Sequence, residues 1–587
     1  MKNNTHFAIR IAGPAGLGMH SIMDIIAGSF ASFGQHVITD SEYQSIIKWG
    51  LNYYDVHICS EKPYITRAVD VVISLNEKNI YPNLVDLKEW GLLIANQKWI
   101  SKVEVTHPDL RSKYIVIDPL IEEKYENTYL LGILAGYLGL DTVIFESAIE
   151  KSFKKKGEEV VEKNIEIFRE YAKTGSSFCH SECNGGISFS WNYEEKLLNS
   201  HKMSLKEIPT GWQKSSENQQ KSLTYWNKAL VHGAIASELE FFSAYPMTPA
   251  STILSEIVNS GSVKYLQAED EIAVINIALG AAFTGSRAMV GTSGGGFALM
   301  TEWLSFAAQA EFPIVAILSQ RSGPSTGTPT YFEQSEISYA LVPTFGGCDH
   351  VVLCPSTMEE GYYMAGQALN IAQVYQTTVI ILTDKQYSEG KVTVSELIPA
   401  PLRRGKILEN PSEWYKRYEL TEDGISPYVR VGTESGDFIA TSYEHDEYGA
   451  TTEEMDMKVK MTEKRANKLE NFYEKEGIMW YRVVNPTAKK MILTLSFTAY
   501  TAEAWCDENP EWGMIVITCL KPLDIRLRDV IIWLDKVVFV ESNYSGQLED
   551  YITKEFGLKY IQGLRVDHLR KYDLLPFYME DFNTLKN

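Results

Sequence analysis

The sequence predicts a multidomain α/β protein whose parallel sheets are covered by helices. Short apolar strands alternate with helical stretches in three separate blocks, which is the pattern of such sheets. The 587 residues also exceed what one hydrophobic core usually organises, so several domains are expected. Because 45% of the residues are hydrophobic and 22% are charged, each domain can bury a core, and a largely disordered chain is not expected.

The chain is acidic, with 55 Lys+Arg against 76 Asp+Glu and a net charge of −21. This balance argues against nucleic-acid binding, which depends on clustered Lys and Arg. No apolar stretch reaches the roughly 18–20 residues that span a bilayer, and the first residues lack the apolar core of a signal peptide. Seven cysteines in so long a chain suit a reducing compartment. We therefore expect a cytoplasmic protein that binds neither nucleic acid nor membrane.

The first block, residues 1–185, is expected to form one α/β domain. An apolar helix is predicted around 19–33 and a Lys/Glu-rich helix over 144–172. The strand candidates of this block are 7–13, 36–40, 69–76, 91–97 and 114–118. The polar residues 186–223 follow and are expected to be a linker.

The rest of the chain is expected to form two further α/β domains, residues 224–395 and 486–587. Between them, residues 396–485 form a charged connecting segment with a helical stretch at 457–476. The strand candidates of the two domains are 243–248, 287–293, 313–320, 350–356 and 378–384, then 491–497, 514–520 and 537–543.

Two local patterns near the N-terminal side could bind a ligand. The glycine-rich stretch IAGPAGLG at 11–18 lies between a strand and a helix, where backbone N–H groups can hold a phosphate. The dinucleotide pattern G-x-G-x-x-G needs glycine where Ile11 stands, although Asp40 could bind a ribose, so a tight turn is the alternative. Cys179 and Cys183 supply half of a tetrahedral metal site, and we expect no metal site in this chain.

Four segments in the centre of the chain indicate a ligand site. Each joins the end of a predicted strand to a loop or a helix, which is where open parallel sheets bind ligands. Glycines and small hydroxyl residues there let a ligand approach the backbone. The segments are AYPMTPAS (244–251), QAEDEIAVINIALGAA (267–282), GTSGGGFALMTE (291–302) and SQRSGPSTGTPT (319–330).

This series resembles the alpha subunit of the 2-oxoacid:ferredoxin oxidoreductases, whose usual forms are YPITP, Q-x-EDE-x-A, TSGPGFSLM and QR-GPSTG-PT. The first block resembles the gamma domain that is fused ahead of alpha in many members, through GPAGLG (13–18) and SEYQSIIKWG (41–50). Further segments with close equivalents in that family are TVIILTDKQYSEG (378–390), YEHDEYGATTE (443–453), KRANKLE (464–470), VVFVESNYSGQLED (537–550) and KYDLLPF (571–577).

The resemblance implies three α/β domains, of the gamma, thiamine-pyrimidine-binding and transketolase-C-terminal types, and an enzyme. It would use thiamine diphosphate to decarboxylate a 2-oxoacid, transfer the acyl group to coenzyme A and pass electrons to ferredoxin, or run in reverse. A separate beta subunit would hold the diphosphate, its Mg²⁺ and the iron–sulfur cluster, in a heterodimer or a dimer of heterodimers. The acid, the direction and the oligomeric state stay open.

The resemblance also assigns roles to five residues. Glu271 would hydrogen-bond the aminopyrimidine of the cofactor, beside Tyr245 and Pro246. Thr248 and Arg321 would bind the substrate carboxylate and share in catalysis. Ordinary alternatives exist for each role: acids that favour a helix N-terminus, an arginine that caps a strand end, and a threonine beside a structural proline.

Departures from the family pattern leave other functions open. The glycine loop has Ala15 and Leu17 where glycine and glutamine are common, RGG appears as KWG at 48–50, SGPG as SGGG at 293–296, and GST as SFT at 496–498. These changes put coenzyme A handling and subunit contacts in doubt more than they do decarboxylation. A non-oxidative thiamine-dependent decarboxylase subunit and a catalytically silent scaffold paralogue are therefore the alternatives.

Overall fold

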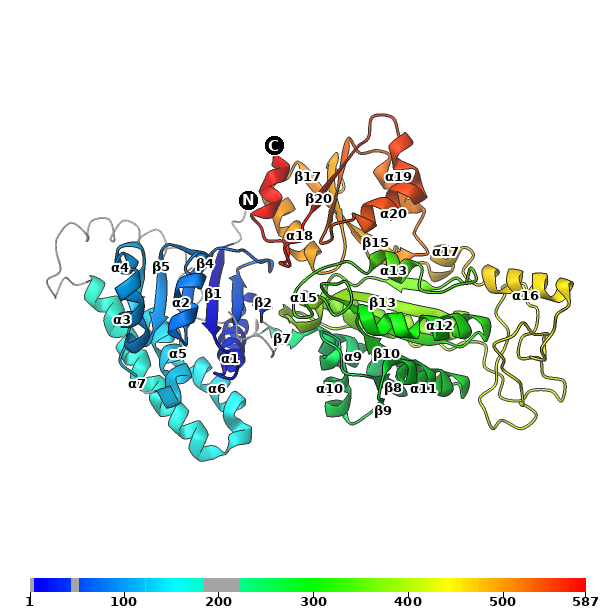
Figure 1. Cartoon of the computed structure of the whole chain (residues 1–587), viewed down its shortest axis with the longest axis horizontal. Coiled ribbons are helices and arrows are strands. Elements are labelled where there is room, and N and C mark those ends of the chain that lie inside the picture. The colour runs from blue at the N-terminus through cyan, green and yellow to red at the C-terminus, as the bar shows by residue number, and fades with distance from the viewer. Residues whose placement is uncertain (1–4, 44–51, 122, 184–220, 587) are drawn as a thin grey trace. The chain divides into compact units, whose positions relative to one another are not determined.

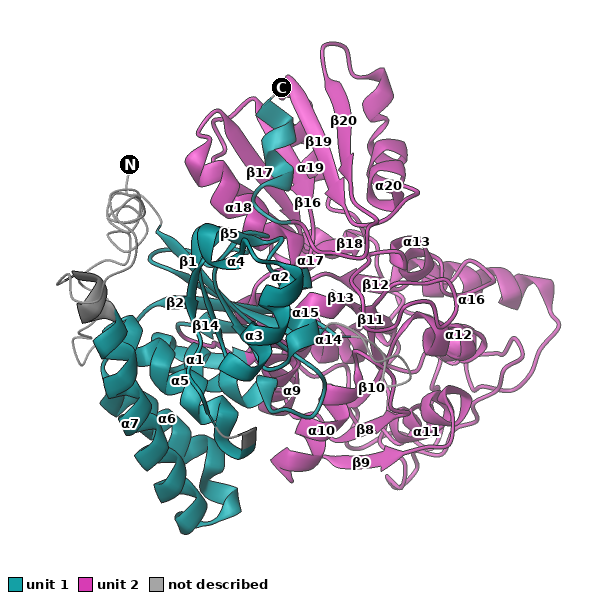
Figure 2. Ribbon diagram, turned by 60° about the vertical axis from the view of Figure 1, so that its left-hand side comes forward, with its two compact units in different colours: residues 1–224, 390–395, 578–587 teal, residues 225–389, 396–577 magenta. Residues whose placement is uncertain are grey.

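The computed structural model describes residues 5–43, 52–121, 123–183 and 221–586. The chain divides into two units, which Figure 2 colours separately. Unit 1 contains residues 1–224, 390–395 and 578–587, and unit 2 contains residues 225–389 and 396–577. Each sheet lies within a helix-covered α/β arrangement, so the predicted fold class is confirmed (Figure 1).

Unit 1 is built on an eight-stranded sheet with the strand order β6-β5-β4-β1-β3-β2-β14-β7. The strands are β1 (His6–Gly13), β2 (His36–Glu42), β3 (Asn52–Cys59), β4 (Val69–Ser74), β5 (Leu87–Ala95), β6 (Ile115–Ile117), β7 (Ser222–Tyr225) and β14 (Lys391–Val394). The helices are α1 (Met19–Ser32), α2 (Ile80–Asn83), α3 (Gln97–Thr106), α4 (Leu110–Lys113), α5 (Glu126–Tyr137), α6 (Thr142–Phe153) and α7 (Glu158–Cys183). Two hydrophobic clusters fill this unit, the larger of which includes α1, α5 and α6.

The sheet of unit 1 is mixed, not wholly parallel as the sequence suggested. Strand β3, which the sequence analysis missed, runs antiparallel between β1 and β2. It carries Arg10's partner Asp55 into the core, where the two side chains form a bidentate ion pair with N–O distances of 2.9 and 2.8 Å. Polar residues such as Asn52, Asp55 and His57 broke the apolar pattern that identified the other strands.

Strand β14 explains why the units differ from the expected boundaries 1–185, 186–223, 224–395, 396–485 and 486–587. It pairs antiparallel with β2, and the Thr393 hydroxyl accepts a hydrogen bond of 3.0 Å from the backbone N–H of Val37. Residues 578–587 also group with unit 1, through contacts such as the Met579 N–H donating to the Ile65 carbonyl at 3.0 Å. Most of the expected linker, 184–220, lies outside the described residues.

Unit 2 contains a seven-stranded sheet with the order β18-β12-β13-β11-β10-β8-β9. Its strands are β8 (Phe241–Ala244), β9 (Lys264–Gln267), β10 (Ala288–Thr292), β11 (Ile314–Gln320), β12 (Val351–Leu353), β13 (Thr378–Asp384) and β18 (Cys519–Lys521). All pairs are parallel except β12 with β18. The central strands β10, β11 and β13 are buried throughout, as expected for parallel strands covered on both faces.

The second sheet of unit 2 has five strands in the order β15-β17-β16-β19-β20, and only β15 is antiparallel to its neighbour. The strands are β15 (Tyr481–Val484), β16 (Lys490–Thr494), β17 (Trp512–Ile517), β19 (Lys536–Glu541) and β20 (Arg565–Arg570). One hydrophobic core joins residues of this sheet to residues of the seven-stranded sheet. The predicted second and last domains therefore form a single unit.

The helices of unit 2 start at signals that the sequence contains. Helix α14 begins with a capping box of Thr357 and Glu360, and α11 begins with Asp270, whose side chain accepts from the backbone N–H of Ala273 at 2.8 Å. The helices are α9 (Trp226–Ala236), α10 (Ser251–Ser260), α11 (Glu271–Phe283), α12 (Gly294–Gln309), α13 (Ile337–Leu341), α14 (Met358–Tyr375), α15 (Lys385–Glu389), α16 (Met455–Asn467), α17 (Phe472–Glu476), α18 (Thr498–Glu508), α19 (Arg526–Ile531) and α20 (Gln547–Phe556).

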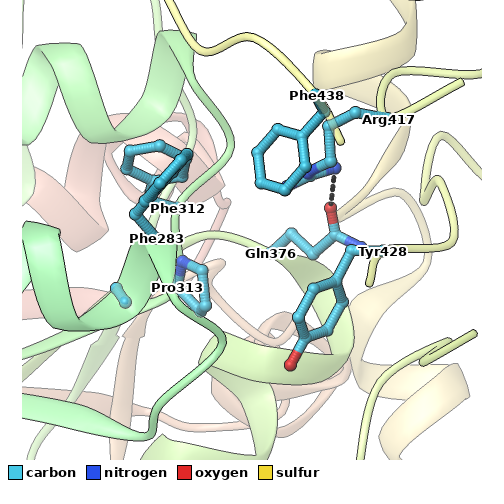
Figure 3. Close-up of a pocket in the computed structure, with 8 residues that line it drawn as sticks. Phe283, Phe312, Pro313, Gln376, Arg417, Tyr428 and Phe438 are labelled. Carbon is cyan, nitrogen blue, oxygen red and sulfur yellow. Dashed lines mark hydrogen bonds between the residues drawn. The ribbon is translucent and has the colours of Figure 1, made fainter. Parts of the chain in front are cut away.

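The connecting segment has no regular element between β14 and α16, yet it packs closely on the seven-stranded sheet domain. Figure 3 shows this packing: Phe438 of the segment lies against Phe283 at the end of α11, with ring centroids 5.1 Å apart. Arg417 of the same segment donates a hydrogen bond of 2.9 Å to the Gln376 side chain. Side-chain packing thus replaces secondary structure in ordering this segment.

Candidate active site

The four central segments meet at one edge of the seven-stranded sheet. Strands β11, β10, β8 and β9 are parallel neighbours, so their carboxyl ends lie side by side (Figure 1). Each end leads directly into one of the segments that the sequence analysis singled out. The topology therefore brings four predicted site residues to the same edge: Tyr245, Thr248, Glu271 and Arg321. Open parallel sheets bind ligands at the carboxyl ends of their strands, which we call the carboxyl-end rule.

Glu271 is the first residue of α11, and 3% of it is exposed. None of the described residues hydrogen-bonds to its Oε1 atom, although that atom is buried. Burial raises the pKa of the Glu271 carboxyl, and the charge of Arg321 acts in the opposite direction. A buried carboxyl oxygen without a partner is costly in an interior, so this oxygen is available for a ligand.

Gly296 makes room for the Glu271 carboxyl. A Cβ added at Gly296 would lie 2.4 Å from Glu271 Oε1 and 2.2 Å from Thr292 Oγ1. The glycine in the first turn of α12 is therefore a steric requirement for the position of Glu271. The sequence analysis noted the SGGG turn but assigned no role to its glycines.

Arg321 follows β11 and connects two of the segments. Its Nη1 atom donates a hydrogen bond of 2.7 Å to the backbone carbonyl of Thr248. Only 7% of Arg321 is exposed, and burial lowers the pKa of its guanidinium while the charges of Glu336 and Glu271 act against that shift. The carbonyl contact places Thr248 beside the guanidinium.

Tyr245 and Pro246 lie at the surface beside this buried group. Tyr245 is 40% exposed, and Pro246 is exposed as well. Both follow β8 directly, at the edge of the sheet where the β9–α11 connection with Glu271 also lies. Their exposure is consistent with a role in contacting a bound molecule or a partner chain.

Glu336 is a site residue that the sequence analysis missed. It precedes α13, and a Cβ added at Gly294 would lie 2.5 Å from its Oε1 atom. Burial and the charge of Glu333 raise the pKa of Glu336 to about 8, while Arg321 lowers it. The only signal in the sequence was the position of Glu336, in the segment YFEQSEIS (331–338) that follows Arg321. Acids in loops are too common for such a position to indicate a site.

Of the two patterns near the N-terminal side, the described residues contain the glycine-rich stretch. The glycine loop joins β1 to α1 with Gly16 and Gly18 at φ values of 92° and 75°, which is a tight turn, and Asp40 is buried in β2. The KWG departure at 48–50 and the side chains of Cys179 and Cys183 lie outside the described residues.

Two kinds of feature are absent from the described residues. No group of three or more His, Cys, Asp or Glu side chains there could hold a metal ion. Within the same residues, no helix combines the length and the apolar character needed to cross a membrane.

Two family models match the chain. Residues 232–464 match the model described as pyruvate flavodoxin/ferredoxin oxidoreductase, thiamine diphosphate-binding, and residues 8–173 match the model described as pyruvate ferredoxin/flavodoxin oxidoreductase. The first match contains all five predicted site residues and Glu336.

Similar proteins cover nearly the whole chain. The alpha subunit of 2-oxoacid:ferredoxin oxidoreductase 2 from Aeropyrum pernix is 28% identical over 94% of this chain and 93% of its own length. The corresponding alpha subunit from Sulfolobus sp is 29% identical over 92% of this chain and 90% of its own length. Among solved structures, a 2-oxoglutarate:ferredoxin oxidoreductase from Magnetococcus marinus, with 2-oxoglutarate, coenzyme A and succinyl-CoA bound, superposes with a TM-score of 0.83 at 27% identity, covering 100% of this chain and 99% of that one.

The fold, the carboxyl-end site and these matches define an oxidoreductase subunit with a thiamine diphosphate-binding domain. The chain belongs to the 2-oxoacid:ferredoxin oxidoreductase family and is an alpha subunit with a gamma-type domain fused at its N-terminal side. The resemblance drawn from the sequence is confirmed. The relatives are named as alpha subunits, so each of them is one chain of a multisubunit enzyme.

Proposed function

We propose that this chain is the gamma–alpha subunit of a cytoplasmic thiamine diphosphate-dependent enzyme that oxidatively decarboxylates a 2-oxoacid. The acyl group passes to coenzyme A and the electrons pass to ferredoxin, or the reaction runs in reverse. The observation that carries the proposal is the buried Glu271 Oε1, which has no hydrogen-bond partner among the described residues and lies in a space that Gly296 leaves open.

The Glu271 site fits the aminopyrimidine of thiamine diphosphate. A carboxyl with a raised pKa can hold a proton and share it with a ring nitrogen, and its free oxygen provides the position for that hydrogen bond. When bound, the cofactor supplies a nucleophilic thiazolium carbon that the amino acids themselves lack. Glu271 would hydrogen-bond the aminopyrimidine of the bound cofactor and fix its tautomer, and the exposed Tyr245 and Pro246 would contact it.

Arg321 and Thr248 suit the substrate carboxylate. A guanidinium has five N–H donors, and the Thr248 carbonyl engages Nη1, so the remaining donors can bind a carboxylate. The low exposure of Arg321 excludes water and strengthens that interaction. The Thr248 hydroxyl would hydrogen-bond the same carboxylate and fix its orientation.

A beta subunit completes the site in this proposal. Exposed apolar side chains lie on the elements that lead into or follow the four central segments, and solvent covers them in this chain alone. They are Tyr245, Tyr265, Leu266, Ile272 and Leu299, which are 40–47% exposed. A partner that buries this surface would also hold the diphosphate, Mg²⁺ and the iron–sulfur cluster, and two such heterodimers would pair.

The test uses the complex with the beta-type partner, coexpressed and purified without oxygen. Reduction of a viologen dye is followed with a panel of 2-oxoacids, with and without coenzyme A. We expect acid-dependent reduction that falls by roughly 10²-fold or more in Glu271→Gln, because proton transfer by a positioned carboxyl contributes about 10²–10⁴-fold.

The matched control is Glu269→Gln, which changes an exposed acid two residues away and should keep wild-type turnover. Decarboxylation without dye reduction would favour a non-oxidative enzyme. No turnover from a stable, cofactor-loaded complex would favour a scaffold. Equal turnover in Glu271→Gln and wild type would remove Glu271 from the mechanism.

A further inference from the structure

Glu336 lies in a second carboxyl-binding space in the same turn that accommodates Glu271. Gly294 leaves room for Glu336 Oε1 as Gly296 leaves room for Glu271 Oε1, since an added Cβ would lie 2.5 and 2.4 Å from the two oxygens. Nothing lies within 4 Å of a Cβ at the intervening Gly295. The turn therefore accommodates two carboxyl groups, one from α11 and one from the residue before α13.

The Glu336 carboxyl has an oxygen that is free to bind a proton or a ligand. Its Oε2 atom is buried and receives no hydrogen bond from the described residues. The backbone N–H of Glu336 donates to Gln320 Oε1 at 3.1 Å, which fixes the residue at the end of β11. An unpartnered carboxylate oxygen is unfavourable in such a place, whereas a protonated carboxyl requires less compensation.

Two acids act on the loop that carries the predicted substrate-binding arginine. Glu333 Oε2 accepts a hydrogen bond of 3.3 Å from the backbone N–H of Gly323, and the charges of Glu336 and Arg321 act on each other. One carboxyl group thus holds the loop backbone at Gly323, and the other acts on the Arg321 guanidinium. A change in either carboxyl acts on the position and on the surroundings of Arg321.

The charged groups around Glu336 come from three elements. Glu333 of the same loop raises the pKa of Glu336 and Arg321 lowers it, with burial as the largest cause of the rise to about 8. Glu271 of α11 acts on Arg321. Burial lowers the pKa of the Arg321 guanidinium, and the charges of Glu336 and Glu271 oppose this lowering. Two carboxyl groups, Glu336 and Glu271, therefore act on Arg321.

We propose that Glu336 is a positioning residue for Arg321 that also controls, by gaining or losing a proton, how strongly Arg321 attracts the carboxylate of a 2-oxoacid. The proposal rests on the proposed function, since it concerns the same substrate. A neutral Glu336 leaves the charge of Arg321 for the substrate, while an ionised Glu336 neutralises part of that charge and repels the incoming anion.

The direction of the pH effect follows from this repulsion. Below the pKa of Glu336 the carboxyl is neutral and the acid binds fully. Above it, binding of the substrate carboxylate requires uptake of a proton, so KM rises with pH while kcat changes less. Because Glu333 raises the pKa of Glu336, removal of the Glu333 charge should move the rise to lower pH.

The first experiment measures KM and kcat from pH 6.5 to 9.5 for the intact complex, with its best 2-oxoacid. For wild type we expect KM to rise about threefold or more between pH 7 and 9. Glu336→Gln should remove this rise, and Glu333→Gln should keep it with an earlier onset. Gly294→Ala, which displaces the carboxyl without altering its charge, should raise KM across the whole range.

The second experiment counts protons without turnover. Binding of an unreactive oxalyl amide, oxamate or N-oxalylglycine, is measured by calorimetry at pH 9 in two buffers of different ionisation enthalpy. Wild type should take up close to one proton, and Glu336→Gln should take up almost none. Urea unfolding of each variant checks that its fold is intact.

The outcomes distinguish this proposal from the proposed function. If wild type turns over a 2-oxoacid but its KM profile matches that of Glu336→Gln, the role of Glu336 is overturned while the function stands. If no 2-oxoacid is turned over, the proposed function fails, and the proton count alone decides whether Glu336 responds to a bound carboxylate. Equal proton uptake in wild type and Glu336→Gln would overturn the proposal in either case.

Discussion

At the scale of single residues, the site depends on glycines, which have no side chain, as much as on its carboxyl groups. The turn from Ser293 to Gly296 contacts two carboxyl groups. Gly294 provides the space for Glu336, and Gly296 provides the space for Glu271. The central Gly295, where the family commonly has proline, faces open space. That departure therefore leaves the geometry of Glu271 and Glu336 unchanged.

A glycine scan of this turn separates the positions. Gly296→Ala should lower kcat of the complex at least tenfold, because the new Cβ must displace the Glu271 carboxyl. Gly295→Ala should keep kcat and equal or exceed the wild-type stability, since alanine favours a helix by about 1 kcal/mol over glycine. Steady-state kinetics and urea unfolding measure both effects. Equal losses in the two variants would show that the turn is sensitive to any substitution rather than to crowding of Glu271.

The sequence predicted which residues share the site but not the full set. The strand ends brought Thr248, Glu271 and Arg321 together because the carboxyl-end rule depends only on parallel neighbours. Glu336 was not predicted because its position depends on the space left by Gly294. The two residues belong to separate segments, and sequence periodicity does not reveal contacts between such segments. The chemical roles of the site residues stay predictions until the variants are measured.

At the scale of elements, a buried charge cluster anchors α16. Lys464 of that helix, and Lys468 just after it, contact the two oxygens of the fully buried Glu311 at 2.6 Å. Arg417 of the connecting segment donates to the backbone carbonyl of the same glutamate at 3.0 Å. The charges hold both the helix and the irregular segment against the end of α12. Lys464 and Glu311 are 153 residues apart, so no local pattern indicated this pairing.

Removing the central charge should loosen this part of unit 2. Glu311→Gln leaves two buried ammonium groups without a counter-ion, so we expect a loss of about 3–5 kcal/mol in the free energy of unfolding. Glu444→Gln is the control, because Glu444 also pairs with two cations, Lys458 and Arg465, but is 13% exposed. It should lose about 1 kcal/mol. Urea unfolding of the two variants tests this order, which comparable losses would contradict.

At the scale of the whole molecule, sequence order and spatial grouping differ. The alternating blocks predicted the α/β class and most strands of the parallel regions, since apolar runs between helices are a strong local signal. They missed β3, β7, β9, β14, β15 and β20, where polar side chains or short length hide the pattern. The return of 390–395 and 578–587 to unit 1 depends on pairing between distant segments, which local patterns do not contain.

The grouping of residues 578–587 can be tested with one aromatic side chain. Tyr578 is buried, groups with unit 1 and has Asp55 of β3 and Arg10 of β1 as electrostatic neighbours, so Tyr578→Ala should cost about 3–5 kcal/mol and reduce amide protection in β1 and β3. Tyr560→Ala, which changes a side chain that is 93% exposed, should alter stability by less than about 0.5 kcal/mol. Hydrogen exchange locates the effect. Loss of protection in β11 and β13 instead would assign the segment to unit 2.

The pairing of β14 with β2 has a consequence for biosynthesis. Val37 and its partner Thr393 are separated by 356 residues, so the ribosome delivers the two halves of this strand pair far apart in time. The edge of β2 stays unpaired while residues 225–389 of unit 2 are translated. An exposed edge of this kind invites pairing with other nascent chains, so a chaperone or early partner that shields β2 would increase the yield of correctly folded protein.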